Sequence, residues 1–186
     1  MIFVALFYIS ACSQTDETNN NQDKLKEQIK ELTKQINEQE NQIKELTETN
    51  KELMYEIDRL NQESELFSSI SNVSKEFIEA HTAGNQEKLK KLLSDEMELV
   101  EREDILYVVS EDDYEWSLFN SNSELTLSDW IIQGFHFDLE ENTYLVHIRE
   151  FYIDKKGNSV IPPTFLNLYF KHQDDEWKIV KLSFDV

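Results

Sequence analysis

Cysteine, glycine and proline are scarce in this chain of 186 residues, which contains one Cys, three Gly and two Pro. A disulfide and a thiolate metal cluster each need more than one thiol, so neither can form within the chain. The glycines, Gly84, Gly134 and Gly157, are too far apart to form a glycine-rich loop that cradles phosphate. These absences exclude a disulfide scaffold and the common nucleotide-binding loops.

Motifs for metal binding and for nucleophilic catalysis are also missing. The four histidines, His81, His136, His147 and His172, are not spaced as HxH or HExxH. The GxSxG sequence of a nucleophile elbow does not occur. We therefore expect no metal site and no cofactor, and we identify no catalytic residue from a motif.

Positive charge is the third scarce feature. The chain has 18 Lys and Arg against 38 Asp and Glu, which gives a formal net charge of -20. A charge of this size repels the phosphates of nucleic acids and anionic lipid headgroups. The composition thus argues against a nucleic-acid partner.

The first residues form an apolar run, residues 2–11, which ends at Cys12. The run is shorter than the roughly 20 residues that span a membrane, but its length suits the apolar region of a secretory signal. The tetrad Ile9-Ser10-Ala11-Cys12 resembles the lipobox of bacterial lipoproteins. The alternative is a buried strand with a core cysteine, although residues 13–24 offer no apolar side chain to pack against it.

The lipobox resemblance implies a signal peptide at residues 1–11, cleavage before Cys12, and lipid attached to the Cys12 sulfur. Two acyl chains give stable anchoring, whereas a single chain gives only marginal membrane binding. On this hypothesis the protein is a bacterial lipoprotein, anchored in the cell membrane and facing the extracytoplasmic side.

Residues 12–23 form a polar tract with too little apolar surface to offset the entropy of ordering, so we predict a flexible tether there. Over residues 24–67, apolar residues recur at alternating steps of four and three, which is the heptad repeat of a coiled coil. The a positions hold Ile29, Ile36, Ile43 and Ile57, and the d positions hold Leu25, Leu32, Leu46, Leu53 and Leu60.

Branched residues at a with Leu at d favour a parallel, two-stranded coiled coil. Asn50 lies at an a position, where a single polar residue specifies the register at a cost in stability. The e and g positions place no like charges opposite each other in a parallel pair. We therefore predict a parallel homodimer through residues 25–67. The alternative is a single amphipathic helix folded back on the C-terminal domain.

Residues 68–186 are predicted to form a compact domain that begins with helices. Ser71 or Ser74 can cap the first helix, Gly84 suits its left-handed end, and Asn85 can cap a second short helix. The stretch 77–97, with this helix, turn and helix order and a Leu-Ser-Asp exit, resembles the opening of the nuclear transport factor 2-like (NTF2-like) superfamily. The run that begins at Trp177 resembles the closing strand of such domains.

Runs typical of strands cover residues 97–100, 104–109, 130–139, 143–154, 164–172 and 177–184. The predicted fold class is therefore α+β: a long N-terminal coiled-coil helix followed by an NTF2-like domain, with helices packed on a curved antiparallel sheet. A cystatin-like domain would show the same pattern.

The NTF2-like resemblance implies a conical domain that often holds a ligand or an active site. Enzymes that resemble ketosteroid isomerase need a carboxylate base set against a hydroxyl or acid donor in an apolar pocket. The candidate pocket residues are Asp138, His147, Glu150 and Tyr152. Side-chain alternation puts Glu150 and Tyr152 on one face of the 143–154 strand and His147 on the other, but both faces are mixed.

Two functions fit these observations. The first, which we favour, is a non-catalytic surface lipoprotein whose coiled coil displays an NTF2-like domain that binds a small ligand or a protein. The second is a small enzyme of isomerase, dehydratase or hydrolase type that uses the pocket of the same domain.

Overall fold

The computed structural model describes residues 13–110 and 114–185. The predicted signal peptide, residues 1–11, and the predicted lipid attachment site, Cys12, lie outside the described residues. The chain divides into two units, Met1–Tyr55 and Glu56–Val186. Within the described residues, no helix combines the length and the apolar character needed to cross a bilayer.

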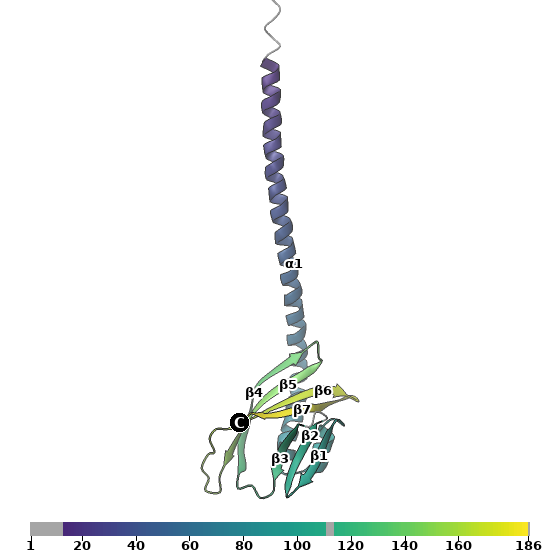
Figure 1. Ribbon diagram of the computed structural model, residues 1–186, viewed down its shortest axis with the longest axis vertical. Helices are drawn as coiled ribbons and strands as arrows, with labels where there is room; N and C mark the ends of the chain where they lie inside the picture. Colours follow the sequence, from purple (N-terminus) through teal and green to yellow (C-terminus); the bar gives the residue numbers. More distant parts are fainter. Residues whose placement is uncertain (1–12, 111–113, 186) are drawn as a thin grey trace, which may run out of the picture. The chain divides into compact units, whose positions relative to one another are not determined.

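The helix α1 runs from Ser13 to Thr82 and supplies the described part of the first unit (Figure 1). This confirms the long helix predicted from the apolar periodicity. The bounds of α1 include most of the polar tract that the sequence predicts to be a tether, because Asn, Gln and Thr can extend a helix that stronger helix formers have nucleated. The predicted caps at Ser71 and Ser74 are wrong, since α1 continues through both residues and its backbone is bonded within the helix.

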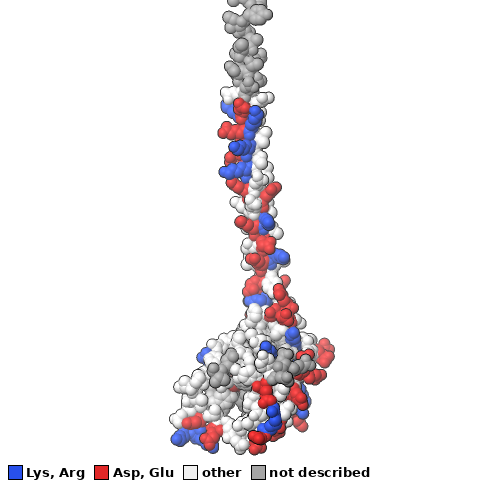
Figure 2. Space-filling view, in the orientation of Figure 1, with Lys and Arg blue, Asp and Glu red and all other residues white. Residues whose placement is uncertain are grey.

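The apolar stripe of the first unit is exposed. Its members have between 53% and 63% of their surface exposed, and they are Leu25, Ile29, Leu32, Ile36, Ile43, Leu46 and Leu53. Figure 2 shows acidic and basic side chains interspersed along the same helix. An apolar stripe beside mixed charges is the pattern of a helix that pairs with another helix.

In its described residues, the second unit contains the C-terminal part of α1, the short helix α2, Gln86–Leu92, and seven strands. Three strands form one antiparallel sheet in the order β1-β2-β3, and four form another in the order β4-β5-β6-β7 (Figure 1). The strands are β1 Met97–Arg102, β2 Ile105–Ser110, β3 Glu115–Asn120, β4 Thr126–Asp138, β5 Thr143–Ile153, β6 Thr164–Gln173 and β7 Glu176–Asp185. The α+β class and the antiparallel pairing are confirmed. The strands form two sheets, and the described strands do not close into a barrel.

The core lies between the C-terminal part of α1 and the two sheets. Helix α1 contributes Ile70, Phe77 and Ile78, the four-stranded sheet contributes Tyr144, Val146, Ile148, Leu166, Leu168 and Phe170, and the three-stranded sheet contributes Leu106, Val108 and Leu118. All of these are less than 9% exposed, so both sheets and the helix share one core. At about 25 cal/mol per Å² of apolar surface, this burial is the main favourable term in folding.

The four-stranded sheet contains two bulges in the pairing of β4 with β5. The pairing of β4 with β5 shifts register twice, once between Leu127 and Asp129 and once between Ile132 and Gly134. Such bulges increase local bending of a strand, which agrees with the predicted curvature.

The end of α1 is also as predicted, because Gly84 has φ of 63° and the Asn85 side chain accepts a hydrogen bond from the Lys88 amide at 3.0 Å.

Candidate functional site

A cavity of about 630 Å³ opens where the end of α1 meets β3 and the four-stranded sheet. Its lining comes from α1, β3, the β3–β4 loop and the ends of strands β4 to β7. Small-molecule sites in proteins occupy roughly 300–1,000 Å³. The cavity is therefore large enough for a ligand, and three ionisable side chains line it: His81, Glu150 and Tyr152.

His81 and Glu150 form a buried pair at this cavity. The Nε2 atom of His81 lies 2.7 Å from Oε1 of Glu150, and the two side chains are 2% and 0% exposed. The other ring nitrogen of His81, Nδ1, lies 3.1 Å from the carbonyl oxygen of Leu118 on β3. The ring also stacks on Phe77, one turn earlier in α1, with centroids 5.3 Å apart. These contacts hold the imidazole in one orientation.

The hydrogen-bond partners restrict where the protons of the pair can be. A backbone carbonyl only accepts, so Nδ1 of His81 carries a proton and donates to Leu118. One further proton then lies between Nε2 of His81 and Oε1 of Glu150. The pair is either an imidazolium with a carboxylate or a neutral imidazole with a carboxylic acid. Its net charge is zero in both arrangements.

Tyr152 completes the cluster from the same face of β5. Its hydroxyl donates to Oε2 of Glu150 at 3.0 Å. Burial, together with the charge of Glu150 and this hydrogen bond, raises the pKa of Tyr152 far above its usual range. The phenol therefore stays protonated at neutral pH, and both oxygens of Glu150 are bonded.

The apolar part of the cavity wall consists of two aromatic rings, Phe119 and Phe184, and of Leu118, Leu125 and Leu127. Phe119 lies directly against Gly84, because a Cβ atom at position 84 would be only 2.7 Å from Cδ1 of the Phe119 ring. Phe184 packs on Trp116, with ring centroids 5.9 Å apart. The rings are thus held by their neighbours rather than by a ligand.

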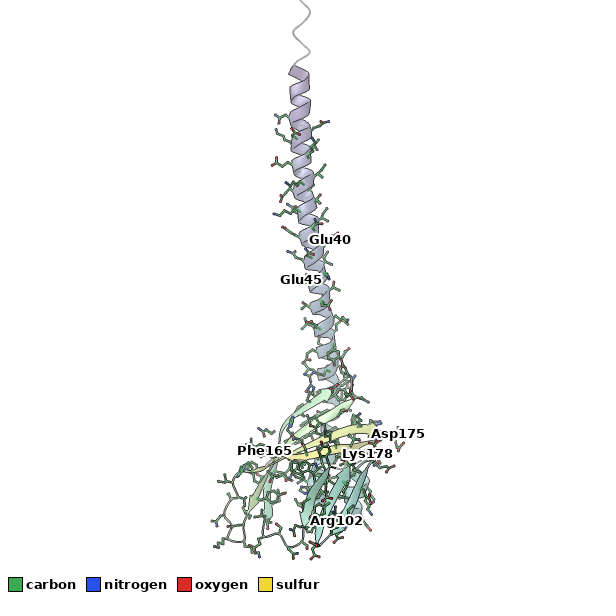
Figure 3. All side chains as sticks on the ribbon, viewed as in Figure 1. Glu40, Glu45, Arg102, Phe165, Asp175 and Lys178 are labelled. Carbon is green, nitrogen blue, oxygen red and sulfur yellow. The ribbon has the colours of Figure 1, made fainter. Side chains whose placement is uncertain are left out.

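Hydroxyl and amide side chains supply most of the remaining lining. They come from α1, β3, the β3–β4 loop, β4 and β6, and they are Thr82, Ser117, Asn120, Ser121, Ser123, Thr126 and Thr164. No Lys, Arg or Asp is among the described residues that line the cavity. Figure 3 labels two basic residues of the domain, Arg102 on β1 and Lys178 on β7. Arg102 pairs with Glu115, and Lys178 pairs with Glu176 and binds the Lys91 carbonyl.

A second polar cluster ties α1 to β4 in the same unit. Oε2 of Glu63 accepts hydrogen bonds from the Phe137 amide at 2.8 Å and from Nη1 of Arg59 at 2.6 Å. The Tyr144 hydroxyl donates to the Glu63 carbonyl at 3.0 Å. Glu63 is 8% exposed, so its charge is satisfied by these groups rather than by bulk water. The cluster fixes the helix that carries His81 on the sheet that carries Glu150.

The four candidate residues from the sequence occupy three places. Glu150 and Tyr152 lie together at the cavity, on the buried face of β5. Asp138 lies at the end of β4, where its Oδ1 accepts from the amides of Glu140 and Glu141 and so caps the β4–β5 turn. His147 is exposed on the opposite face of β5, and its Nδ1 lies 2.6 Å from Oδ1 of Asn167.

His81 is the site residue that the sequence prediction did not select. It is separated from Glu150 by 69 residues, so no local motif joins the two. One signal was available: His81 follows Phe77 by four residues and therefore lies on the apolar face of a helix. A polar residue on such a face needs a buried partner, and a carboxylate on an otherwise apolar strand face is the complementary signal.

No group of three or more His, Cys, Asp or Glu side chains within residues 13–110 and 114–185 is arranged to hold a metal ion. Comparison of the sequence with protein families and with curated proteins finds no match. The order of a long helix followed by a small antiparallel sheet domain agrees with the architecture predicted from the sequence. The likeness to NTF2-like domains stays a prediction.

Proposed function

We propose that this protein is a bacterial surface lipoprotein, anchored through Cys12, whose helix pairs with a second copy of the chain and whose C-terminal domain is a non-catalytic, NTF2-like binding module. The observation that carries the proposal is the exposed heptad stripe of α1 together with a separate helix face that binds the domain. The exposed heptad stripe supports pairing with a second helix, and the cavity of the C-terminal domain supports ligand binding.

Two different faces of α1 serve these two purposes. Near the start of the domain, Arg59 at position c and Glu63 at position g contact β4, and Ile70 and Phe77 at later g positions lie in the core. In the same unit, Ile57 at a and Leu60 at d are 55% and 47% exposed. Up to Leu60 the a and d face is therefore open to a partner helix, whereas the next d residue, Phe67, packs on Phe135 of β4.

The chemistry of the a and d face favours a second copy as the partner. Ile at a and Leu at d match themselves in a parallel pair, and Asn50 would meet Asn50 of the partner. The facing g and e residues, such as Gln35 with Glu40 or Gln42 with Thr47, bring no like charges together. The stripe continues to Phe67 at d, which is 36% exposed and lies 4.5 Å from Phe135 of β4, centroid to centroid.

The anchor is tested by mass spectrometry of the N-terminal peptide from protein expressed in a bacterium and recovered from membranes. The proposal predicts a chain that begins at Cys12 with a lipid adduct on that residue. A Cys12→Ser variant should appear without the adduct and leave the membrane fraction. Membrane-recovered protein with an uncleaved Met1, or with an unmodified Cys12, would contradict the anchor.

A second candidate function, a small enzyme of isomerase, dehydratase or hydrolase type, is favoured by one observation. His81 and Glu150 share a proton at the wall of the cavity, and such a pair can give or take a proton. The side chains of His81 and Glu150 are nevertheless only 2% and 0% exposed, so a substrate would have to break their hydrogen bond to reach the proton. For this reason we favour the binding module. If the protein turned over a substrate, and Glu150→Gln abolished this turnover with the fold intact, the enzyme would be favoured over the binding module.

A further inference from the structure

The chemistry of the cavity indicates the class of ligand that it accepts. Three observations bear on this: the charge of the lining, the kind of polar groups in it, and the arrangement of its aromatic rings. This inference rests on the proposed binding function and adds the identity of the ligand class.

The lining carries no net charge. Glu150 is paired with His81 and accepts from Tyr152, so its charge is compensated within the wall. The lining residues that the structure describes include no Lys or Arg, so an anionic ligand would lose its hydration without gaining a counter-charge from them. The net charge of -20 of the whole chain adds a further penalty for an anion. A cation would find Glu150 already paired with His81, and the described part of the lining offers it no further carboxylate.

The polar groups of the lining can form hydrogen bonds with hydroxyl groups of a ligand. Ser117, Ser121, Thr126 and Thr164 each present a hydroxyl that can both donate and accept a hydrogen bond. Ser117, Ser121 and Thr126 are exposed, so a ligand can reach them. A ligand that carries several neutral hydroxyl groups would exchange hydrogen bonds with water for equivalent bonds with this wall.

The aromatic rings supply a complementary apolar surface. Phe119 and Phe184 line the cavity and are fixed by Gly84 and Trp116, respectively. A sugar ring has hydroxyl groups at its rim and an apolar C–H face, and the C–H face packs on an aromatic ring. Hydroxyl groups and fixed aromatic rings therefore occur together in this cavity in the combination that a sugar ring needs.

From these observations we infer that the cavity at His81, Glu150 and Phe119 binds an uncharged saccharide. The ligand's hydroxyl groups bind the Ser and Thr side chains of β3, β4 and β6, and the C–H face of a ring packs on Phe119 or Phe184. The volume of about 630 Å³ accommodates a short oligosaccharide segment rather than a whole polymer.

The test is calorimetric titration of the full chain with neutral trisaccharides of glucose, of mannose and of N-acetylglucosamine. Two charged trisaccharides, of glucosamine as the cation and of galacturonate as the anion, serve as comparisons. The inference predicts saturable binding of at least one neutral trisaccharide and weaker or no binding of both charged ones. Absence of binding by all three neutral trisaccharides, or tighter binding of a charged one, overturns it.

Variants locate the binding. Ser117→Ala and Ser121→Ala each remove one exposed hydroxyl of the wall. Loss of one hydrogen bond weakens affinity by roughly 2- to 10-fold, so each variant should show a weakening in this range. The controls are Ser128→Ala on β4 and Ser68→Ala on α1, at exposed residues that do not line the cavity. Equal weakening by the controls would place the ligand elsewhere and overturn the assignment.

The same sample separates this inference from the proposed function. A chain that is lipidated and dimeric but binds no neutral trisaccharide refutes the ligand class and leaves the lipoprotein proposal standing. A chain that binds a trisaccharide but is neither lipidated nor dimeric refutes the lipoprotein proposal and keeps the cavity assignment.

Discussion

Nε2 of His81, at the end of α1, lies 2.7 Å from Oε1 of Glu150, near the C-terminal end of β5 on its core-facing side. This bond connects the helix to the four-stranded sheet across 69 residues of sequence. Because both side chains are buried, each depends on the other for its hydrogen bonds. The pair therefore contributes to the stability of the domain as well as to the wall of the cavity.

Replacing Glu150 tests how much the buried pair contributes. Glu150→Ala leaves the His81 ring and the Tyr152 hydroxyl without their partner, and we expect a loss of about 3–5 kcal/mol in the free energy of unfolding. Glu150→Gln should cost less, because its amide can donate to His81 and accept from Tyr152. Urea denaturation gives both values. The control is Glu98→Ala, an exposed carboxylate on β1 that should change stability by about 0.5 kcal/mol or less. Similar values for Glu150→Ala and the control would contradict this account.

The pH dependence of stability tests the burial of Tyr144. Burial, and secondarily the charge of Glu63, raises the pKa of Tyr144 from 10.0 to about 12. The folded state thus holds the phenol proton more tightly than the unfolded state, so this contribution is present below pH 10.0 and is lost as pH rises to 12. In the wild type, the free energy of unfolding should fall with pH in this window, and Tyr144→Phe should make the fall less steep. Tyr114→Phe, at a residue that is 64% exposed, is the control. A slope unchanged in Tyr144→Phe would show that the phenol is not buried.

Alanine substitutions at the three glycines test the packing of the cavity wall. Gly84 and Gly157 have φ of 63° and 81°, a conformation that costs an L-residue about 1–2 kcal/mol. At Gly84 the new Cβ would also meet the Phe119 ring at 2.7 Å, whereas nothing lies within 4 Å at Gly157. Thermal unfolding should therefore rank the losses as Gly84→Ala, then Gly157→Ala, then Gly134→Ala. If Gly157→Ala were as harmful as Gly84→Ala, the contact with Phe119 would have no energetic importance.

Substitution of Asn50 tests the heptad register. Asn50→Ile replaces the polar a residue by the residue found at the other a positions, so the helix pair should melt at a higher temperature and lose its restriction to one register or oligomeric state. Gln39→Leu at a d position is the matched control, because it adds apolar surface and keeps Asn50. Circular dichroism measures the melting, and sedimentation measures the distribution of oligomers. A lower melting temperature for Asn50→Ile would argue against position 50 lying in the seam.

Much of the fold could be predicted because its determinants are local. Apolar residues such as Ile36 and Leu46 recur at alternating steps of three and four, and this periodicity identifies a helix without any tertiary information. Gly84 and Asn85 mark the end of one helix and the start of the next, as the structure shows. Strand β3 was not predicted, since its six residues follow an acidic stretch and present no clear alternation.

The candidate site could be predicted only in part, because its determinants are tertiary. Both faces of β5 carry charged and apolar residues, and the sequence alone does not say which face is buried. The structure settles this through His81, which gives Glu150 a partner on the inner face. Asp138 looked equivalent in the sequence, but its carboxylate is used by the turn that follows it. A carboxylate's role thus depends on which amide or imidazole the fold brings to it.

Sedimentation equilibrium of the chain, free of membrane, tests the central claim of paired helices most directly. The account predicts a mass twice that of one chain, which is 22.1 kDa for all 186 residues and less after cleavage before Cys12, and predicts that Leu46→Lys at the centre of the stripe lowers it to the mass of one chain. The exposed Glu45→Lys beside it should leave the dimer intact (Figure 3). A mass of one chain for the unsubstituted protein, at all concentrations tested, would contradict the account.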